Sequence, residues 1–200
     1  MERIICLLIG YVFGLFQTGY FYGLTKHIDI RKYGSGNAGT TNTLRTLGWK
    51  AGIITFFGDC MKSVLAVLAV KAIFAEHELL SLLAMYAGMG VVLGHNYPVW
   101  LGFKGGKGVA STLGMMLVLT PLVGVLTCLT WLFMAFTFRY SSLSALTALC
   151  LAPVYAIIWA TPSAAGCYTL LALLSLWRHR GNIKRLLNGE ESKINFKRKK

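Results

Sequence analysis

The chain has 200 residues, of which 56% are hydrophobic and 14% charged, and its mean hydropathy is +0.60. A water-soluble domain of this size can hardly bury so large an apolar fraction, so the composition excludes a soluble globular protein and indicates an integral membrane protein. A net charge of +13 would suggest a nucleic-acid partner in a soluble protein, but here the basic residues lie mostly between apolar segments, which excludes that partner.

Seven apolar segments follow one another along the chain, and we interpret each as a transmembrane helix. The predicted spans are residues 4–24, 51–75, 79–97, 108–120, 122–138, 143–160 and 163–178. Seven crossings use about 140 residues and leave about 60 for loops and ends, so no separate soluble domain fits. The sequence therefore predicts one all-α, membrane-embedded domain over residues 1–200, whose first span is a retained helix and not a signal peptide.

Basic residues are distributed unevenly between the loops. The segments 25–50, 98–107 and 139–142, together with the tail from residue 178, hold 17 of the 20 lysines and arginines. Alternating loops place these four segments on one side of the membrane, and the positive-inside rule makes that side cytoplasmic. The N-terminus is then outside, the C-terminus is cytoplasmic, and the basic run at 197–200 is a solvated tail that touches anionic lipid.

Cysteines and intramembrane charges add two smaller expectations. All five cysteines fall within predicted spans without a CxxC pair, so we interpret them as packing residues and expect neither a disulfide nor a metal site. Asp59 and Lys62 lie three residues apart in the second span, on one face of a helix, and can pair. Each buried charge costs at least about 2.5 to 3.5 kcal/mol, so we expect a structural pair that supports a functional site.

Glycines gather in two short stretches. Residues 34–48 and 94–108 hold nine of the 22 glycines, and both stretches fall in the basic loops. Ordering a glycine costs roughly 0.5 to 1 kcal/mol more than ordering an alanine, so this clustering indicates tight turns or close approach to a ligand.

The first glycine stretch opens with Gly34-Ser35-Gly36-Asn37-Ala38-Gly39, a literal match to GxGxxG. No strand precedes it, so we exclude a dinucleotide-binding fold. Successive N–H groups with the hydroxyls of Ser35 and the neighbouring threonines instead predict an anion-binding concavity. Arg45 adds a planar, bidentate donor suited to phosphate.

The second glycine stretch contains Lys104-Gly105-Gly106-Lys107-Gly108. A Walker A loop needs Ser or Thr after the lysine and a glycine at position 101, where this chain has Leu101, so ATP binding in that form is excluded. Two lysines among glycines, directly before a predicted span, favour a phosphate site at a helix N-terminus. A flexible basic loop that merely obeys the positive-inside rule is the alternative.

Two further polar segments lie on the predicted cytoplasmic side. Arg139-Tyr140-Ser141-Ser142 precedes the sixth span, where its hydroxyls can bind a ligand or simply cap the helix. The segment from His179 to Glu191 combines a histidine, the amide of Asn182 and carboxylates in a region that is otherwise basic. Alone it would be typical of a juxtamembrane helix.

Together these segments resemble the motifs of the bacterial acyl-phosphate:glycerol-3-phosphate acyltransferases, and the likeness extends over nearly the whole chain. The residues that carry it are Ser35-Gly36-Asn37-Ala38-Gly39 with Asn42 and Arg45; Gly94-His95 with Phe103-Lys104-Gly105-Gly106-Lys107-Gly108; Arg139-Tyr140-Ser141-Ser142; and His179-Arg180, Asn182-Ile183, Arg185-Leu186, Gly189 and Glu191. The resemblance implies a seven-helix enzyme of the bacterial inner membrane that faces the cytoplasm. It would move an acyl group from acyl phosphate to the 1-position of glycerol 3-phosphate, giving lysophosphatidate and phosphate, the first step of phospholipid synthesis.

The resemblance also implies roles for individual residues. Catalytic roles fall to Ser35, Asn37, Lys104, His179 and Asn182. Acyl phosphate would contact Ser35, Gly36, Asn37, Gly39, Thr41, Gly105, Gly106 and Ser141. Glycerol 3-phosphate would contact Arg45, Lys104, Ser142, His179 and Asn182. Supporting roles fall to Asn42, His95, Lys107, Asp59, Lys62 and Glu191, and no cofactor, metal or obligate protein partner is expected.

We expect direct acyl transfer without a covalent acyl-enzyme. The more familiar glycerolipid acyltransferases pair a histidine with a following aspartate, but after His95 the corresponding position is Trp100. Phosphate is a good leaving group, so less activation is needed, and the proton would go to the departing phosphate or, as the alternative, to His179 or His95. The competing hypothesis is a transporter for an anionic phosphorylated metabolite, which would require a site near the midplane, often between internal repeats, and we find no repeat.

Overall fold

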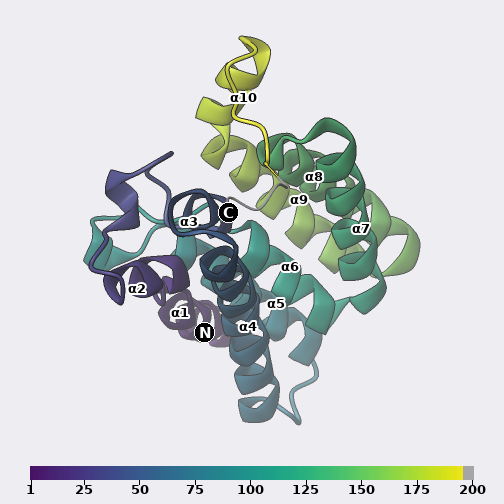
Figure 1. The fold of residues 1–200 in the computed structure, drawn as a ribbon. Helices are drawn as coiled ribbons and strands as arrows, with labels where there is room; N and C mark the ends of the chain where they lie inside the picture. Colours follow the sequence, from purple (N-terminus) through teal and green to yellow (C-terminus); the bar gives the residue numbers. More distant parts are fainter. Residues whose placement is uncertain (196–200) are drawn as a thin grey trace. The chain divides into compact units, whose positions relative to one another are not determined.

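A computed structural model describes residues 1–195, and every regular element in this range is helical, as the sequence predicts (Figure 1). The α-helices are α1 (Glu2–Gly14), α2 (Thr18–Leu24), α3 (Thr40–Leu47), α4 (Trp49–Ile73), α5 (Leu80–Asn96), α6 (Val109–Leu119), α7 (Pro121–Phe138), α8 (Ser141–Trp159), α9 (Pro162–Arg178) and α10 (Arg180–Leu187). The 3-10 helices are η1 (Ile30–Lys32) and η2 (Val99–Leu101). The basic run at 197–200, predicted to touch lipid, lies outside the described residues.

Each of the seven predicted spans contains helix, but within residues 1–195 only four stretches are both long and apolar enough to cross a membrane. They are Glu2–Leu24, Trp49–Ile73, Pro121–Phe138 and Ser141–Trp159. Helices α5, α6 and α9 are shorter than these four stretches, with 17, 11 and 17 residues. The chain is therefore an all-α protein with several membrane-crossing helices, while the count of seven stays a prediction.

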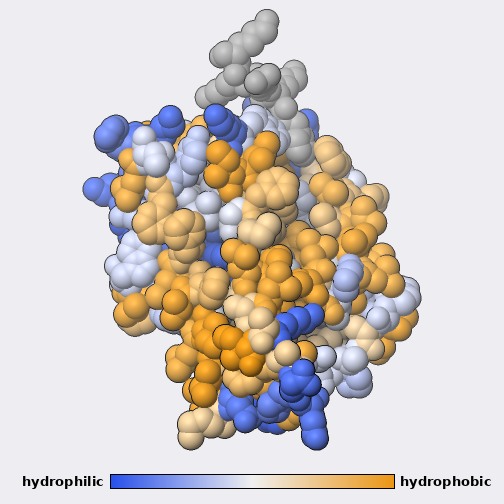
Figure 2. All heavy atoms as spheres, turned by 90° about the horizontal axis from the view of Figure 1, so that it is seen from below, coloured by the Kyte–Doolittle hydropathy of each residue, from blue (hydrophilic) through white to orange (hydrophobic). Residues whose placement is uncertain are grey.

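Apolar side chains cover much of the surface. Figure 2 shows hydrophobic residues over most of the visible face, with hydrophilic residues gathered in separate patches. Ile4, Phe133 and Ile157 are 66%, 67% and 72% exposed. Soluble monomers rarely expose large contiguous apolar patches, whereas lipid-facing helices do, so this surface agrees with an integral membrane protein.

The described residues fall into two compact units, one from Met1 to Leu119 and the other from Thr120 onward. In the first unit, α1 packs along α5, and α4 packs against α6. Glycines allow these close approaches, because a Cβ at Gly10 would overlap the carbonyl oxygen of Ala87 and a Cβ at Gly114 would overlap the backbone of Cys60. Small residues at helix contacts are the usual means of packing inside membranes.

The first predicted span is not one continuous helix, which corrects the expectation for residues 4–24. Helix α1 ends at Gly14 and α2 begins at Thr18. The buried side chain of Gln17 lies in the interruption, and its Nε2 donates to the carbonyl oxygens of Gly14 (3.1 Å) and His95 (3.2 Å). A polar side chain thus replaces part of the missing helical hydrogen bonding.

In the second unit, α8 packs against both α7 and α9. Buried or half-buried hydroxyls join these helices: Thr120 Oγ1 lies 2.6 Å from Tyr168 Oη, and Thr130 Oγ1 lies 2.8 Å from Tyr155 Oη. After α10 the chain returns to the start of α8, where the N–H of Ile194 donates to the carbonyl of Arg139 (2.6 Å).

The packing interpretation of the cysteines needs one correction. All five are free thiols, and Cys6, Cys60 and Cys167 are buried. Cys150, however, is exposed on α8, and Cys128 is only partly buried. A helix surface that faces lipid accepts a small apolar residue as readily as a core does, so apolarity alone could not separate the two environments.

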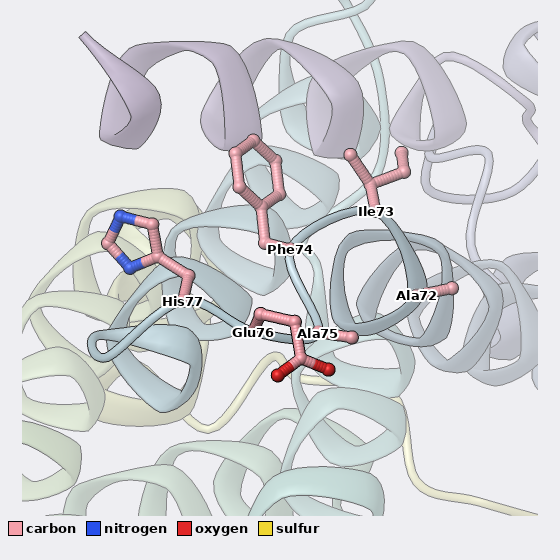
Figure 3. Close-up of a pocket in the computed structure, with 6 residues that line it drawn as sticks. All are labelled: Ala72, Ile73, Phe74, Ala75, Glu76 and His77. Atoms are coloured by element: carbon pink, nitrogen blue, oxygen red, sulfur yellow. The ribbon is translucent and has the colours of Figure 1, made fainter.

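A shallow hollow lies at the C-terminal end of α4 (Figure 3). It is lined by Ala72, Ile73, Phe74, Ala75, Glu76 and His77. Phe74 points toward α1, where it packs against a core cluster that contains Cys6, whereas the carboxylate of Glu76 points away from α1. None of the predicted site residues lines this hollow.

The contact between α1 and α5 gives a stability prediction. Gly10→Ala places a methyl group against the Ala87 carbonyl, and overpacking of this kind costs about 1 to 3 kcal/mol. Thermal unfolding of the purified protein in detergent measures the loss. Gly166→Ala is the matched control, because nothing lies within 4 Å of its Cβ position, and it should not lower stability. Equal midpoints for the two variants would contradict this packing.

Candidate active site

The first glycine stretch forms a turn that leads into α3. Gly34 and Gly36 have φ angles of +60° and +70°, a conformation that favours glycine. The buried side chain of Asn42 holds this turn from inside: Oδ1 accepts from the Ser35 N–H at 2.8 Å. Its Nδ2 donates to the carbonyls of residues 30 and 33 at 2.9 and 3.1 Å. Asn42 therefore uses both ends of its amide to fix the loop.

Several residues predicted to bind acyl phosphate stand on this braced turn. Ser35 and Gly36 are exposed, and Arg45 is exposed on α3. Asn37 Oδ1 accepts from the N–H of Gly39 (2.9 Å), which is the residue before α3. Thr41 is half-buried in the first turn of the helix. The turn thus presents a hydroxyl, a guanidinium and a helix N-terminus, an arrangement suited to an anion.

The second glycine stretch folds back onto the end of α5. The N–H of Gly105 donates to the carbonyl of Asn96 (3.2 Å), and the N–H of Gly106 donates to that of His95 (3.0 Å). Both glycines are buried, so these N–H groups are engaged inside the protein. In the structure, the N–H groups of Gly105 and Gly106 thus fix the loop, and contact of these two glycines with acyl phosphate stays a prediction.

The lysines of this loop differ in exposure. Lys104 is exposed, Lys107 is half-buried, and Gly108, with a φ of +77°, precedes α6. Hydrogen bonds hold the two glycines between the lysines, whereas the alternative interpretation of this stretch expects a flexible basic loop. Because Lys104 is exposed, its ammonium group is accessible to a phosphate from solution.

Asp59 and Lys62 pair within α4, as the sequence predicts. Lys62 Nζ lies 3.0 Å from Asp59 Oδ1, and both side chains are almost fully buried. The pair is part of a larger network, because Lys62 Nζ also lies 2.7 Å from Nδ1 of His95, and Thr18 Oγ1 donates to Asp59 at 3.1 Å. Sequence reasoning missed Gln17 and Thr18, although two polar residues inside an apolar span were a usable signal.

In the second unit, Glu191 joins three of the motif residues. Its Oε1 accepts from Ser142 Oγ (2.8 Å) and Asn182 Nδ2 (2.7 Å), and its Oε2 accepts from Arg185 Nε (2.7 Å). Glu191 and Ser142 are buried, at the return of the chain and the start of α8 respectively. Ser141 is half-buried beside Ser142, as the first residue of α8. Glu191 thus orients Ser142 and Asn182, two of the side chains predicted to contact glycerol 3-phosphate.

The environment of Glu191 also lowers the pKa of its carboxyl group. Burial alone would raise the pKa of this carboxyl group. Hydrogen bonds from Asn182, Ser142 and Arg185, with the positive charge of Arg185, outweigh burial and leave the pKa below its ordinary value of 4.5. The carboxylate is therefore ionised at neutral pH.

His179, at the junction of α9 and α10, has a defined hydrogen-bonding direction. It is 3% exposed, and its Nδ1 lies 2.9 Å from the carbonyl oxygen of Ser175. Because a carbonyl can only accept, Nδ1 carries the hydrogen, and in the neutral ring Nε2 is the basic nitrogen. Ser175, one helical turn earlier, is a supporting residue that sequence reasoning missed.

Within the described range, no group of three or more His, Cys, Asp or Glu side chains could hold a metal ion. The site residues themselves offer hydrogen bonding, fixed positive charge and proton transfer at a histidine.

Comparison with known proteins identifies the family. Residues 4–189 match the sequence model of the family described as glycerol-3-phosphate acyltransferase. The glycerol-3-phosphate acyltransferase of Rhodospirillum rubrum is 48% identical over 199 residues, covering 98% of this chain and 92% of the relative. That of a Ruegeria species is 47% identical, covering 94% and 92%.

Solved structures agree with these sequence relatives. The crystal structure of PlsY, described as an integral membrane glycerol 3-phosphate acyltransferase, is similar in its glycerol 3-phosphate form with a TM-score of 0.89 and 34% identity, covering 98% of this chain and 96% of that chain. Its lysophosphatidic acid form has a TM-score of 0.87. This chain is a membrane protein of the glycerol-3-phosphate acyltransferase family.

The lowered pKa of Glu191 gives a pH prediction. The ionised carboxylate favours the folded state above about pH 4.5, and this contribution is lost as the pH falls through the folded-state pKa. Glu191→Gln should therefore lower stability by about 1 to 3 kcal/mol at pH 7. Chemical unfolding in detergent should show a smaller difference between the wild type and this variant at pH 4 than at pH 7.

The neighbouring Glu190 provides the control for that experiment, because it is exposed. Glu190→Gln should change stability little at either pH. A Glu191→Gln effect that stayed constant between pH 7 and pH 4 would show that the carboxylate charge does not matter.

Proposed function

We propose that this chain transfers a fatty acyl group from acyl phosphate to the 1-hydroxyl of glycerol 3-phosphate, releasing lysophosphatidate and inorganic phosphate. Membership of the glycerol-3-phosphate acyltransferase family over almost the whole chain carries the proposal. The donor follows from the resemblance to the acyl-phosphate-dependent enzymes and from Trp100, which stands where an aspartate would complete a His–Asp pair with His95. Phosphate is a good leaving group and needs less activation than a thiolate.

In the first unit we assign acyl phosphate to the turn that Asn42 braces. Ser35 and Asn37 would contact its phosphate or developing oxyanion, assisted by Gly36, Gly39 and Thr41. Charge-assisted hydrogen bonds are about twice as strong as neutral ones, so the exposed Arg45 and Lys104 are suited to the dianionic phosphate of glycerol 3-phosphate.

In the second unit we assign glycerol 3-phosphate contacts to Ser142, His179 and Asn182, and an acyl-phosphate contact to Ser141. Ser142 and Asn182 are held by Glu191, so their orientation is set before substrate arrives. Fixed donors lower the barrier because they need no reorganisation during the reaction.

Transfer is proposed to occur directly. The 1-hydroxyl oxygen attacks the carbonyl carbon, the bond from that carbon to the bridging oxygen breaks, and inorganic phosphate leaves with the electron pair. The hydroxyl proton goes to an oxygen of the departing phosphate or to a histidine. Of the two candidates, the geometry favours His179, whose Nε2 is basic; Nδ1 of His95 accepts from Lys62, so Nε2 of His95 already carries hydrogen.

We also propose the membrane topology expected from the sequence: seven crossings in the bacterial inner membrane, with the N-terminus outside and the motif loops cytoplasmic. The loops and tail on the proposed cytoplasmic side hold 17 of the 20 basic residues, and this asymmetry supports the orientation. Helix α6 has 11 residues and reaches only about 16 Å, so the fourth crossing needs the extended residues before it as well. A cytoplasmic reporter fused after Lys200 tests the orientation, and external exposure would overturn it.

The donor proposal has a direct test. Purified protein in lipid vesicles should convert labelled glycerol 3-phosphate and acyl phosphate into lysophosphatidate without acyl-CoA or acyl carrier protein. Acyl-CoA in place of acyl phosphate should give no product. Product from acyl-CoA alone would overturn the donor assignment, and vesicle uptake of glycerol 3-phosphate without any conversion would favour the transporter hypothesis.

The substrate assignments predict two classes of variant. Arg45→Ala and Lys104→Ala should raise the KM for glycerol 3-phosphate by roughly 10- to 100-fold, since a hydrogen bond to a charged group contributes about 1.5 to 3 kcal/mol. Ser35→Ala and Asn37→Ala should instead impair use of acyl phosphate. Steady-state kinetics with each substrate varied in turn separates the classes.

Lys50→Ala is the control for these variants, because Lys50 is an equally exposed cation at the start of α4 with no assigned role. It should leave both KM values unchanged. Wild-type kinetics in all four site variants would refute the site assignment.

A further inference from the structure

An intramembrane lysine lies at the interruption between α1 and α2. Lys62 is 5% exposed, and its Nζ has three close acceptors, besides the more distant carbonyl oxygen of Gly14 at 3.5 Å. They are Oδ1 of Asp59 at 3.0 Å, the carbonyl oxygen of Phe16 at 2.7 Å and Nδ1 of His95 at 2.7 Å. An ammonium group has three N–H donors and no acceptor, so the three bonds account for all of them.

The Phe16 carbonyl explains why a lysine is needed here. It lies between the end of α1 at Gly14 and the start of α2 at Thr18, where helical hydrogen bonding is interrupted. A carbonyl without a partner inside a bilayer costs several kcal/mol. Lys62 supplies the missing donor from α4, while Asp59 on the same helix balances its charge.

The same ammonium fixes the hydrogen positions of His95. Because Lys62 can only donate, Nδ1 of His95 must accept, and the hydrogen of the neutral ring lies on Nε2. A protonated His95 would place a second cation 2.7 Å from the ammonium, which the low dielectric of this buried position disfavours. The charged and titratable side chains bonded in this network are Asp59, Lys62 and His95.

His95 contacts the lysine-bearing loop in two ways. Its carbonyl oxygen accepts from the N–H of Gly106 at 3.0 Å. Its ring edge lies directly against the same residue, because a Cβ at Gly106 would overlap Nε2 and both neighbouring ring carbons. The orientation of the imidazole therefore limits the conformations of the loop between Lys104 and Lys107.

We propose that Lys62 is a positioning residue: it holds His95 as the Nε2–H tautomer, and the ring fixed in this way sets the loop from which Lys104 meets glycerol 3-phosphate. The contact with glycerol 3-phosphate rests on the proposed function, whereas the tautomer does not. Lys62 acts through His95 and the loop and touches no substrate.

Two variants separate this role from that of a simple ion pair. Lys62→Met alone would leave Asp59 as an unpaired buried charge, which is strongly destabilising. The double variant Asp59→Asn with Lys62→Met removes both charges together and therefore keeps the network neutral. Asp59→Asn alone is the comparison, because it breaks the ion pair but leaves Lys62 to donate to His95; it also leaves the Lys62 charge unpaired, so its thermal midpoint is measured first to establish that it folds.

Nitrogen NMR of the whole protein in lipid nanodiscs reads the tautomer directly. The chain has four histidines, so labelled histidine gives few signals, and His95→Gln assigns the one of interest. We expect His95 to have an unprotonated Nδ1 and a protonated Nε2 in the wild type and in Asp59→Asn. The double variant should lose this preference. A wild-type His95 with hydrogen on Nδ1 would overturn the proposal.

Kinetics of the same proteins tests the functional step. The double variant should raise the KM for glycerol 3-phosphate about 10-fold or more with a smaller change in kcat, because displaced loops weaken binding, while Asp59→Asn should not. A double variant that folds and loses the tautomer but keeps the wild-type KM would overturn the positioning role. If the wild type itself shows no transfer, the proposed function fails, and the NMR result still decides the tautomer.

Discussion

A backbone group inside a bilayer must find its hydrogen bond within the protein, and the first unit is organised around one place where a helix cannot provide it. Between Gly14 and Thr18 the first span is interrupted, and side chains from elsewhere take over. Gln17 donates to carbonyls of α1 and α5, and Lys62 donates from α4 to Phe16. These bonds tie three membrane helices together at the depth where α5 ends and the lysine-bearing loop begins.

A buried polar side chain holds each candidate substrate-binding segment from inside. In the first unit these segments are loops with exposed polar or cationic groups, whereas in the second unit the residues held, Ser142 and Asn182, are themselves buried at the starts of helices. Asn42 braces the first turn, His95 lies under the second loop, and Glu191 holds Ser142 and Asn182 in the second unit. Fixed loops suit an enzyme for phosphate-bearing substrates, because donors that are already oriented lose little entropy on binding. In the first unit the buried residues give the geometry, and the exposed residues give contact and charge.

Much of the fold follows from local sequence patterns. Hydrophobic length predicts a helix in every span, and the i, i+3 spacing predicts the pair of Asp59 and Lys62. What local patterns miss depends on residues that are distant in sequence. One glutamine hardly changes the hydropathy of the first span, so hydropathy predicts a continuous helix there. The interruption is recognised only when the bonds of Gln17 and of the distant Lys62 to its carbonyls are known. Likewise, the sequence does not show that the N–H groups of Gly105 and Gly106 bond to carbonyls at the end of α5.

We propose that two phosphate-bearing substrates react directly with each other on this protein. The stoichiometry of phosphate release from acyl phosphate by the purified protein in vesicles tests this directly. Direct transfer predicts that phosphate appears only when glycerol 3-phosphate is present, one phosphate for each lysophosphatidate. A burst of phosphate without glycerol 3-phosphate, accompanied by acyl group bound to the protein after quenching, would contradict it.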